Sequence, residues 1–306
     1  MTSAIMEDKG RPVDARVQHR VAELISTASI EISPHDDPLR ERLDELLPPQ
    51  TSVFVNHPGS VTHHDIVAAC VKLRQAGFSP VPHVAARRLA SFTQARDFMQ
   101  RAAGEAGVAS ILLIAGDPSR AIGPFSDSLD LLATGLVERH GIARVTFAGY
   151  PEGHPRIDRH SLDTALRAKI AMARQRGLDV SLVTQFGFEA DPIAHWIASL
   201  REEGIRCPIR VGVAGPATIA TLAKFAVRCG IGASLRALGR SQTAFARILT
   251  EATPNALIEA LVAHEDRDTP VEALHVFAFG GVHRSAAWLH TRAQRGGVAY
   301  RTSWSA

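Results

Sequence analysis

The sequence predicts a single-domain (β/α)8 barrel, and three observations lead to this prediction. Short apolar runs alternate with longer amphipathic segments along the 306 residues, which is typical of repeated βα units. Eight such units can be counted, which matches a (β/α)8 barrel in number and in length. A doubly wound open sheet is the alternative, but no GxGxxG follows the first apolar run.

Each of the eight apolar runs is expected to form one strand. In chain order they are ASIEIS (28–33), TSVFVN (51–56), SPVPHV (79–84), VASILLIA (108–115), ARVTFAG (143–149), DVSLVTQF (179–186), PIRVGVA (208–214) and EALHVFAF (272–279).

The segments between these runs have the period of amphipathic helices. In HHDIVAACVKLRQAG, the apolar residues fall on one face and Gly77 stands where a C-cap glycine belongs. The segment 230–265 is longer than the others, so we expect an extra helix before the last strand. Residues 1–24 are expected to form a mobile N-terminal tail, and residues 25–306 the barrel.

Composition excludes several classes of protein. The chain is 45% hydrophobic and 21% charged, and its formal charge of +3 is not concentrated in any run, so nucleic acid is not an expected partner. Its three cysteines show neither metal-ligand nor disulfide spacing, and we expect no metal. No segment resembles a signal peptide or a membrane span, which favours a cytoplasmic protein.

Polar and glycine residues gather where the expected strands end, and these ends form the catalytic face of such barrels. In chain order they are Glu31, Asn56 and His57, His83, Asp117, Tyr150, Glu152 and His154, Gln185, Gly212 and Gly215, and Gly280 with His283. A lone histidine at a strand end is more often structural than catalytic, and this reading is preferred for His57, His275 and His283.

Glu31 is the strongest catalytic candidate, because Ile30 and Ile32 flank it in a strand that is expected to be buried. Burying a carboxylate without a task is costly. Loss of solvation would raise its pKa, so that it could donate a proton near neutral pH. Paired with Asp117, it would combine a general acid with a carboxylate that stabilises a cation.

Six motifs give the chain a resemblance to a known family. SIEISP, PHV, AGDP, GYPEGHP, VTQFGF and LHVFAF occur in the order and approximate spacing of the methylenetetrahydrofolate reductase family, over about residues 28–290. The resemblance implies a (β/α)8 reductase that converts 5,10-methylenetetrahydrofolate to 5-methyltetrahydrofolate with FAD and NAD(P)H. A folate is then the expected partner, and because the family often forms oligomers, a homo-oligomer is compatible with it.

The resemblance also implies a role for individual residues. Glu31 matches the general acid, Asp117 the carboxylate beside the pterin, and Gln185, with Phe186 next to it, the folate-binding position. The residues that match or are assigned to cofactor contacts are Asn56, His83, Gly116, Tyr150, His154 and Lys169.

The chain departs from the family pattern near the expected cofactor. Ala115 stands where an arginine is usual and Asn56 where a threonine is frequent, and the helix after Pro155 is longer, so Arg167 or Arg174 could replace Lys169. A flavin-independent variant, with NADH donating hydride directly to the folate, is therefore an alternative. A folate-dependent methyl or methylene transferase and a non-catalytic folate-binding barrel are two others.

Overall fold

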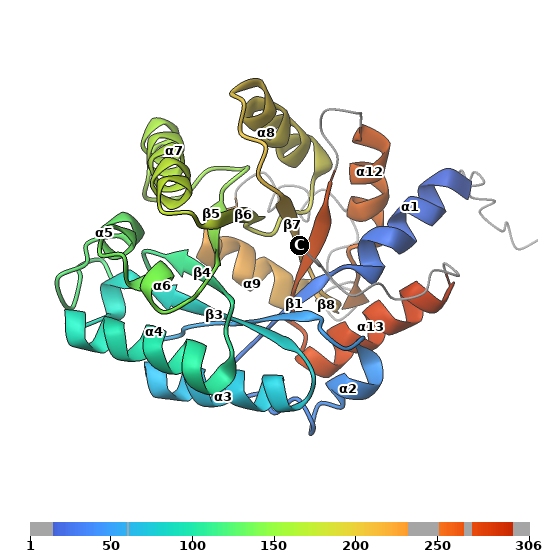
Figure 1. The fold of residues 1–306 in the computed structure, drawn as a ribbon. Helices are drawn as coiled ribbons and strands as arrows, with labels where there is room; N and C mark the ends of the chain where they lie inside the picture. Colours follow the sequence, from blue (N-terminus) through green and yellow to red (C-terminus); the bar gives the residue numbers. More distant parts are fainter. Residues whose placement is uncertain (1–14, 60, 232–250, 266–270, 296–306) are drawn as a thin grey trace, which may run out of the picture.

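Eight parallel strands close into a barrel in the computed structural model, which describes residues 15–59, 61–231, 251–265 and 271–295 (Figure 1). The barrel strands are β1 (Ser29–Ile32), β2 (Ser52–Val55), β3 (Ser79–Ala85), β4 (Ser110–Ile114), β5 (Arg144–Gly149), β6 (Asp179–Thr184), β7 (Ile209–Ala214) and β10 (Ala273–Phe277). Each falls on one of the eight apolar runs, so the predicted (β/α)8 barrel is confirmed.

The ring closes between the first and the last strand. Strand β1 pairs in parallel with β2 on one side and with β10 on the other, where Ser29 lies opposite His275 and Glu31 opposite Phe277. The order around the barrel is β1-β10-β7-β6-β5-β4-β3-β2. The carboxyl ends of all eight strands therefore meet at one mouth, and their amino ends meet at the other.

Helices surround the strands, and capping residues explain where several of these helices begin or end. The helices are α1 (Ala15–Ser26), α2 (Leu43–Leu46), α3 (His63–Gln75), η1 (Ala86–Arg88, a 3-10 turn), α4 (Phe92–Ala106), α5 (Ser128–Ala133), α6 (Leu136–Arg139), α7 (Arg159–Gln175), α8 (Ala190–Glu202), α9 (Ile219–Cys229), α12 (Asn255–His264) and α13 (Val282–Arg295). Thr62 and Asp65 form a reciprocal capping box at the start of α3. Ser91 caps α4, which ends at Gly107 in the left-handed conformation.

Alternation along the strands divides the core into two layers. One face of each strand packs against the helices in the main cluster, which includes Ile30, Val53 and Val145. The other face points into the barrel, where Phe54 and Val81 pack with a few neighbouring side chains. The interior is thus a filled core rather than a channel, as is usual for this fold.

Residues 15–24 differ from the expected mobile tail, because they belong to α1. Val21 and Leu24 of this helix are buried in the main cluster. Arg20 donates to both carboxylate oxygens of Glu265 and to the carbonyl of Val271. The apolar face of α1 makes it part of the barrel, while residues 1–14 lie outside the described range.

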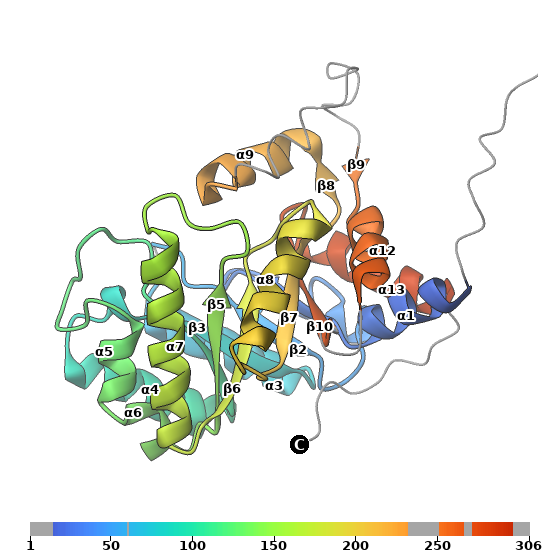
Figure 2. The same cartoon turned by 90° about the horizontal axis from the view of Figure 1, so that it is seen from above.

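The long segment between β7 and β10 leaves the ring of helices. Short strands β8 (Ala217–Thr218) and β9 (Glu251–Ala252) pair in antiparallel fashion, and Figure 2 shows them with α9 standing away from the barrel at one end. The described part of this segment also contains α12, which is the expected extra helix; residues 232–250 lie outside the described range.

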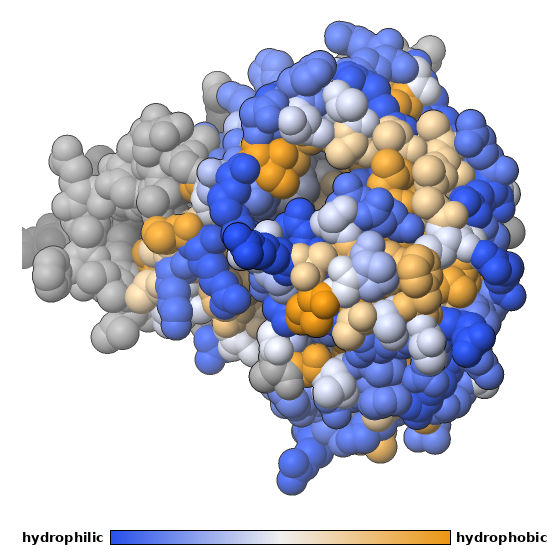
Figure 3. Space-filling view, turned by 90° about the vertical axis from the view of Figure 1, so that its left-hand side faces the viewer, coloured by the Kyte–Doolittle hydropathy of each residue, from blue (hydrophilic) through white to orange (hydrophobic). Residues whose placement is uncertain are grey.

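The outer surface is mixed in character. On the side drawn in Figure 3, hydrophobic residues form small groups between hydrophilic ones. None of the helices in the described ranges combines the length and apolar character needed to cross a bilayer.

Candidate functional site

Three polar side chains from neighbouring strands surround Glu31 at the carboxyl mouth of the barrel. The side chain of Glu31 is only 15% exposed, and its Oε2 lies 3.4 Å from His83 Nε2 and 3.7 Å from His275 Nε2. Asn56 Nδ2 donates to Glu31 Oε1 over 3.3 Å. We call Glu31, Asn56, His83 and His275 the acid cluster. Glu31, Asn56 and His83, which were all expected at strand ends, thus lie together, whereas the expected pairing of Glu31 was with Asp117.

Ser29 orients the imidazole ring of His275. The Ser29 hydroxyl lies 3.2 Å from the carbonyl oxygen of Leu274 and 2.9 Å from His275 Nδ1. On its other side the ring turns Nε2 toward the Glu31 carboxyl group. The interaction between these two groups lowers the pKa of Glu31 and opposes the effect of burial on the pKa of His275.

Burial and charge oppose each other at Glu31. Burial is the largest influence and would raise its pKa, but His83, His275 and Asn56 together lower the pKa of Glu31 below its ordinary value. From the sequence we expected a raised pKa for Glu31. That expectation is wrong, because it considered burial but not the charge and hydrogen bonds of these three neighbours. Burial also lowers the pKa of His83 to about 4 and lowers the pKa of His275, so both histidines favour the neutral form.

Several buried polar atoms at this mouth have no hydrogen-bond partner within the described part of the chain. They are Asn56 Oδ1, His57 Nδ1, His83 Nε2, Arg88 Nε and His275 Nε2. An unsatisfied buried polar atom is costly in a folded protein, so a group of them calls for an explanation. Their gathering around one carboxylate is typical of a site that receives a polar ligand.

The end of β4 places Asp117 at the edge of the same mouth. Its side chain is 74% exposed, and its Oδ2 lies 3.9 Å from the Arg88 guanidinium. Gly116 before it has a φ of +92°, and a Cβ there would come within 3.0 Å of Ala85 Cβ. Only glycine suits this turn, which brings the chain close to β3. No hydrogen bond or ion pair joins Asp117 to Glu31 among the described residues.

The loop that follows β5 brings Tyr150 and His154 together. Their rings meet edge to face with centroids 5.2 Å apart. Arg159 donates to the carbonyl oxygens of Tyr150 and Pro151, and the Gly153 amide donates to the Tyr150 carbonyl, which closes a tight turn. The interpretation of this stretch as a rigid crossing from the barrel to the next helix is consistent with these contacts.

Gln185 and Phe186 lie at the end of β6, beside a group of aromatic rings. Gln185 Oε1 accepts the backbone N–H of Phe186, which orients the amide. Phe186 is buried and packs edge to face on Phe279. Phe279 in turn stacks on Phe225 of α9, with centroids 4.1 Å apart and planes inclined by 17°. Phe225 and Phe279 are both partly exposed, so this stack could extend to a further planar ring.

Lys169 lies in the third turn of α7, away from the other predicted cofactor residues. Ten residues of helix separate it from Arg159, which is about 15 Å along the axis. Burial lowers the pKa of Lys169, and the charge of Asp127, the N-cap of α5, partly offsets this effect. The charge of Asp127 on α5 thus acts on this lysine, and the role of Lys169 in cofactor binding stays a prediction.

Comparison with known proteins shows the family of the chain. The family model described as methylenetetrahydrofolate reductase matches residues 39–235. The chain belongs to the methylenetetrahydrofolate reductase family. The matched range begins after Glu31 and ends before β10, so it includes Asn56, His83, Asp117 and Gln185 but neither Glu31 nor His275.

Two individual proteins are similar to this chain, one in sequence and one in fold. Methylenetetrahydrofolate reductase (NADH) 1 of Arabidopsis thaliana is 28% identical over 120 residues, which cover 35% of this chain and 20% of that protein. The match thus spans about a fifth of the relative's length. A Clostridium thermocellum protein that binds two copies of 5-methyl-5,6,7,8-tetrahydrofolic acid has the same fold, with a TM-score of 0.58 and 11% identity over 91% of this chain and 99% of that one.

Sequence reasoning missed two members of the site in this methylenetetrahydrofolate reductase family chain. His275 was interpreted as structural, although alternation along β10 and the pairing of β10 with β1 bring it to Glu31. Arg88 belongs to none of the motifs above, but its side chain is only 15% exposed and lies beside Asp117. The apolar residues on both sides of His275 could have indicated that it is buried in the barrel. No local sequence pattern indicates that Arg88 belongs to the site.

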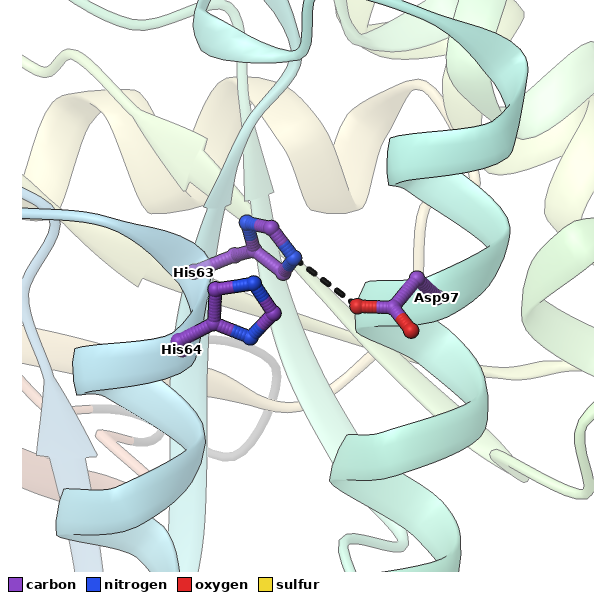
Figure 4. A group of neighbouring side chains, drawn as sticks. All are labelled: His63, His64 and Asp97. Atoms are coloured by element: carbon purple, nitrogen blue, oxygen red, sulfur yellow. Dashed lines mark hydrogen bonds and ion pairs between the residues drawn. The ribbon is translucent and has the colours of Figure 1, made fainter.

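One group of described residues has the composition of a metal site, but its hydrogen bonds favour another interpretation. His63, His64 and Asp97 offer ligand atoms within 4.8 Å of one another (Figure 4). Gln94 Oε1 accepts the amide of Ala90, so its Nε2 must donate to His63 Nδ1. His63 Nε2 then carries the proton that it donates to Asp97 over 2.9 Å, and a protonated nitrogen is no metal ligand.

Proposed function

We propose that this protein reduces 5,10-methylenetetrahydrofolate to 5-methyltetrahydrofolate with NAD(P)H as hydride donor. The observation that carries the proposal is the acid cluster, a buried carboxyl group between two histidines at the catalytic mouth of a barrel of this family. The Arabidopsis relative, named as a reductase that uses NADH, supports the same reaction class.

Glu31 is the group that we assign to deliver the proton that opening of the folate ring requires. In the unliganded site Glu31 favours the ionised form and both histidines the neutral form, so this proton comes from solvent or enters with the substrate. A bound folate would exclude water from the carboxyl group and raise its pKa, so that Glu31 can hold the proton and pass it to the departing folate nitrogen. The Glu31 carboxylate that remains then stabilises the cationic iminium formed by ring opening. Asp117 adds a second negative charge at the rim of the same mouth.

The residues at the carboxyl mouth offer contacts for FAD as well as for the folate. Bound FAD would accept hydride from NAD(P)H and pass it to the methylene carbon. Tyr150, His154 and His83 are the side chains assigned to hold the flavin ring. Arg88, with its buried Nε unpartnered among the described residues, is a suitable cation for a phosphate group in place of the arginine that Ala115 replaces.

Direct hydride transfer from NADH to the folate, without FAD, is a second candidate. Two observations favour it, since Ala115 removes one cation from the end of β4 and Lys169 lies about 15 Å along α7 from Arg159. Fewer cations near the mouth mean a weaker hold on the pyrophosphate of FAD.

Anaerobic assays separate these candidates. NADH or NADPH oxidation is followed in the presence of 5,10-methylenetetrahydrofolate, with and without added FAD, and flavin absorbance of the purified protein is recorded. Folate-dependent oxidation supports the reductase, and its dependence on flavin decides the cofactor. Folate binding without NAD(P)H oxidation under either condition would leave the transferase or the non-catalytic barrel and would overturn the proposal.

Replacement of Glu31 tests the role of the acid cluster. Glu31→Gln keeps the size of the side chain and its contact with Asn56, so we expect normal folding and folate binding but a loss of about 100-fold or more in reduction. Glu105→Gln, on the exposed face of α4, is the matched control and is expected to keep full activity. Unchanged turnover in Glu31→Gln would exclude Glu31 as the acid.

A further inference from the structure

Helix α9 lies across the carboxyl mouth of the barrel. Figure 2 shows it at one end of the molecule, outside the ring of helices. Burial raises the pKa of the thiol of Cys229, its last residue, and the charges of Asp117 and Glu31 add to this effect while Arg228 opposes it. The helix therefore starts soon after the end of β7 and ends near the carboxylates at the mouth.

The first end of α9 is anchored on the barrel. The amide of Gly215 donates to the carbonyl of Phe277 over 2.9 Å, and a Cβ on Gly280 would collide with the carbonyl oxygen of Pro216. The backbone that leads into α9 therefore packs directly on the backbone that follows β10. The side chain of Thr218 then caps the helix. This end has both polar and close-packed attachments.

The far end of α9 rests on the loop after β5 through apolar contact. Gly230, which ends the helix with a φ of +69°, lies so close to Pro155 that a Cβ on this glycine would come within 2.6 Å of the proline ring. Among the described residues, no hydrogen bond or ion pair joins 219–231 to the barrel strands or to their loops. The two ends of α9 are thus held in different ways.

One face of α9 packs on a small group of aromatic side chains that is separate from the main core. Leu222 and Ile231 are buried in this group together with Phe186. The opposite face is open to solvent, since Val227 is 65% exposed. Apolar contacts have no required direction, and a segment with few buried contacts opens more easily than the core. The packing of α9 is therefore suited to opening and closing.

The covered mouth leaves little room for a ligand beside Gln185. Gln185, Phe186, Ile231 and the loop after β5 line a space of about 10 Å³. This volume is at the lower limit for a single water molecule, which needs about 10 to 15 Å³. A folate that contacts Gln185 therefore requires the far end of α9 to move away.

We propose that α9 is a lid on the carboxyl mouth, which turns about its anchored end at Thr218 and opens where Gly230 rests on Pro155. The closed form described here shields the acid cluster from solvent, and the open form admits the substrate. The choice of folate as the entering ligand rests on the proposed function, whereas the movement of α9 does not.

Alkylation of Cys229 by iodoacetamide measures the opening of the lid without any ligand. Cys70 and Cys207 are buried and stay unreactive, so mass spectrometry of the native full-length protein reports on Cys229. Pro155→Ala removes most of the ring that Gly230 contacts, and we expect it to speed alkylation by about three- to tenfold. Pro49→Ala, at an exposed proline before β2, is the matched control and should react as the wild type does. An unchanged rate in Pro155→Ala would overturn the lid.

A disulfide between positions 155 and 230 tests whether the ligand needs an open lid. Pro155→Cys and Gly230→Cys, combined with Cys229→Ser, place two Cβ atoms close together, and a small backbone shift gives the ~3.8 Å that a disulfide needs. The reduced form should bind 5-methyltetrahydrofolate, and the oxidised form should bind it at least about tenfold more slowly.

The two redox forms of this variant share any strain at position 230, so their comparison isolates the effect of the crosslink. Pro155→Cys with Cys229→Ser alone is the control for the oxidant and should bind equally before and after treatment. Equal association rates for the reduced form and the fully crosslinked form would overturn the lid.

These experiments separate the lid from the reductase proposal. Faster alkylation in Pro155→Ala, in a protein that neither binds folate nor oxidises NAD(P)H, would contradict only the proposed function. Folate-dependent NAD(P)H oxidation by the wild type, with an alkylation rate that Pro155→Ala leaves unchanged, would contradict only the lid.

Discussion

At the scale of single residues, the main feature of the site is that two neutral histidines lie beside the buried carboxyl group of Glu31. His83 and His275 are both buried and both favour the neutral form, yet each lies within 4 Å of Glu31. The cluster therefore has fewer protons than acceptors at neutral pH. A proton that enters it from solvent or substrate is held by the pair of Glu31 and His275 rather than by one group alone.

His83 is expected to make the protein sensitive to acid. Its pKa is 6.5 in the unfolded chain and about 4 in the folded one, so the unfolded state binds a proton first as the pH falls. The contribution of His83 to the free energy of unfolding is fully present above pH 6.5. It is lost as the pH falls from 6.5 to 4, and the loss amounts to about 3 kcal/mol. Urea unfolding across this interval should show a shallower pH dependence for His83→Asn than for the wild type.

The control for this prediction is His160→Asn, at an exposed position of α7. It should leave the pH dependence of unfolding as it is in the wild type. Parallel curves for the wild type and His83→Asn would show that His83 does not contribute.

Packing between elements depends on one glycine at the end of β5. A Cβ on Gly149 would lie 2.2 Å from the Trp196 ring of α8, which is itself buried. Glycine here lets the helix approach the strand end, and the Trp196 ring fills the space. Gly149 was expected in the strand ARVTFAG, but the strand pattern gives no sign of this contact with Trp196.

Gly149→Ala is therefore expected to lower the free energy of unfolding by about 1 to 3 kcal/mol, because the ring must move. In a Trp196→Leu background the same change should cost less, which a double-mutant cycle by urea unfolding measures. Gly104→Ala is the control, since a Cβ there meets nothing within 4 Å, and in this exposed helix position it should stabilise the protein by about 1 kcal/mol. A Gly149→Ala cost that Trp196→Leu does not relieve would contradict the assignment.

Helix α1 shows where element prediction fell short. Its apolar residues have helical spacing, but no strand precedes it, so a βα pattern offered no reason to pack it on the barrel. Leu24→Ala should cost about 2 to 5 kcal/mol by urea unfolding, because the side chain is fully buried. His19→Ala on the exposed face should cost less than about 0.5 kcal/mol. Equal small effects would mean that α1 packs loosely.

For the whole molecule, strand count and order were predictable because alternating patterns and length leave few arrangements other than a (β/α)8 barrel. Three members of the acid cluster followed, because they come from consecutive strands β1, β2 and β3. His275 did not follow in the same way. Its contact with Glu31 forms only when the ring closes between β1 and β10, which are far apart in the chain.

Closure of the ring also couples the two mouths. The charge of Arg210 at the amino end lowers the pKa of His275 at the carboxyl end. Removing that charge in Arg210→Gln should therefore raise the pKa of His275. Titration of the histidine resonances by NMR measures the change, with Arg206→Gln as the variant expected to show none. A His275 pKa that falls or stays constant in Arg210→Gln would mean that the apolar layer around Phe54 insulates the acid cluster from the opposite mouth.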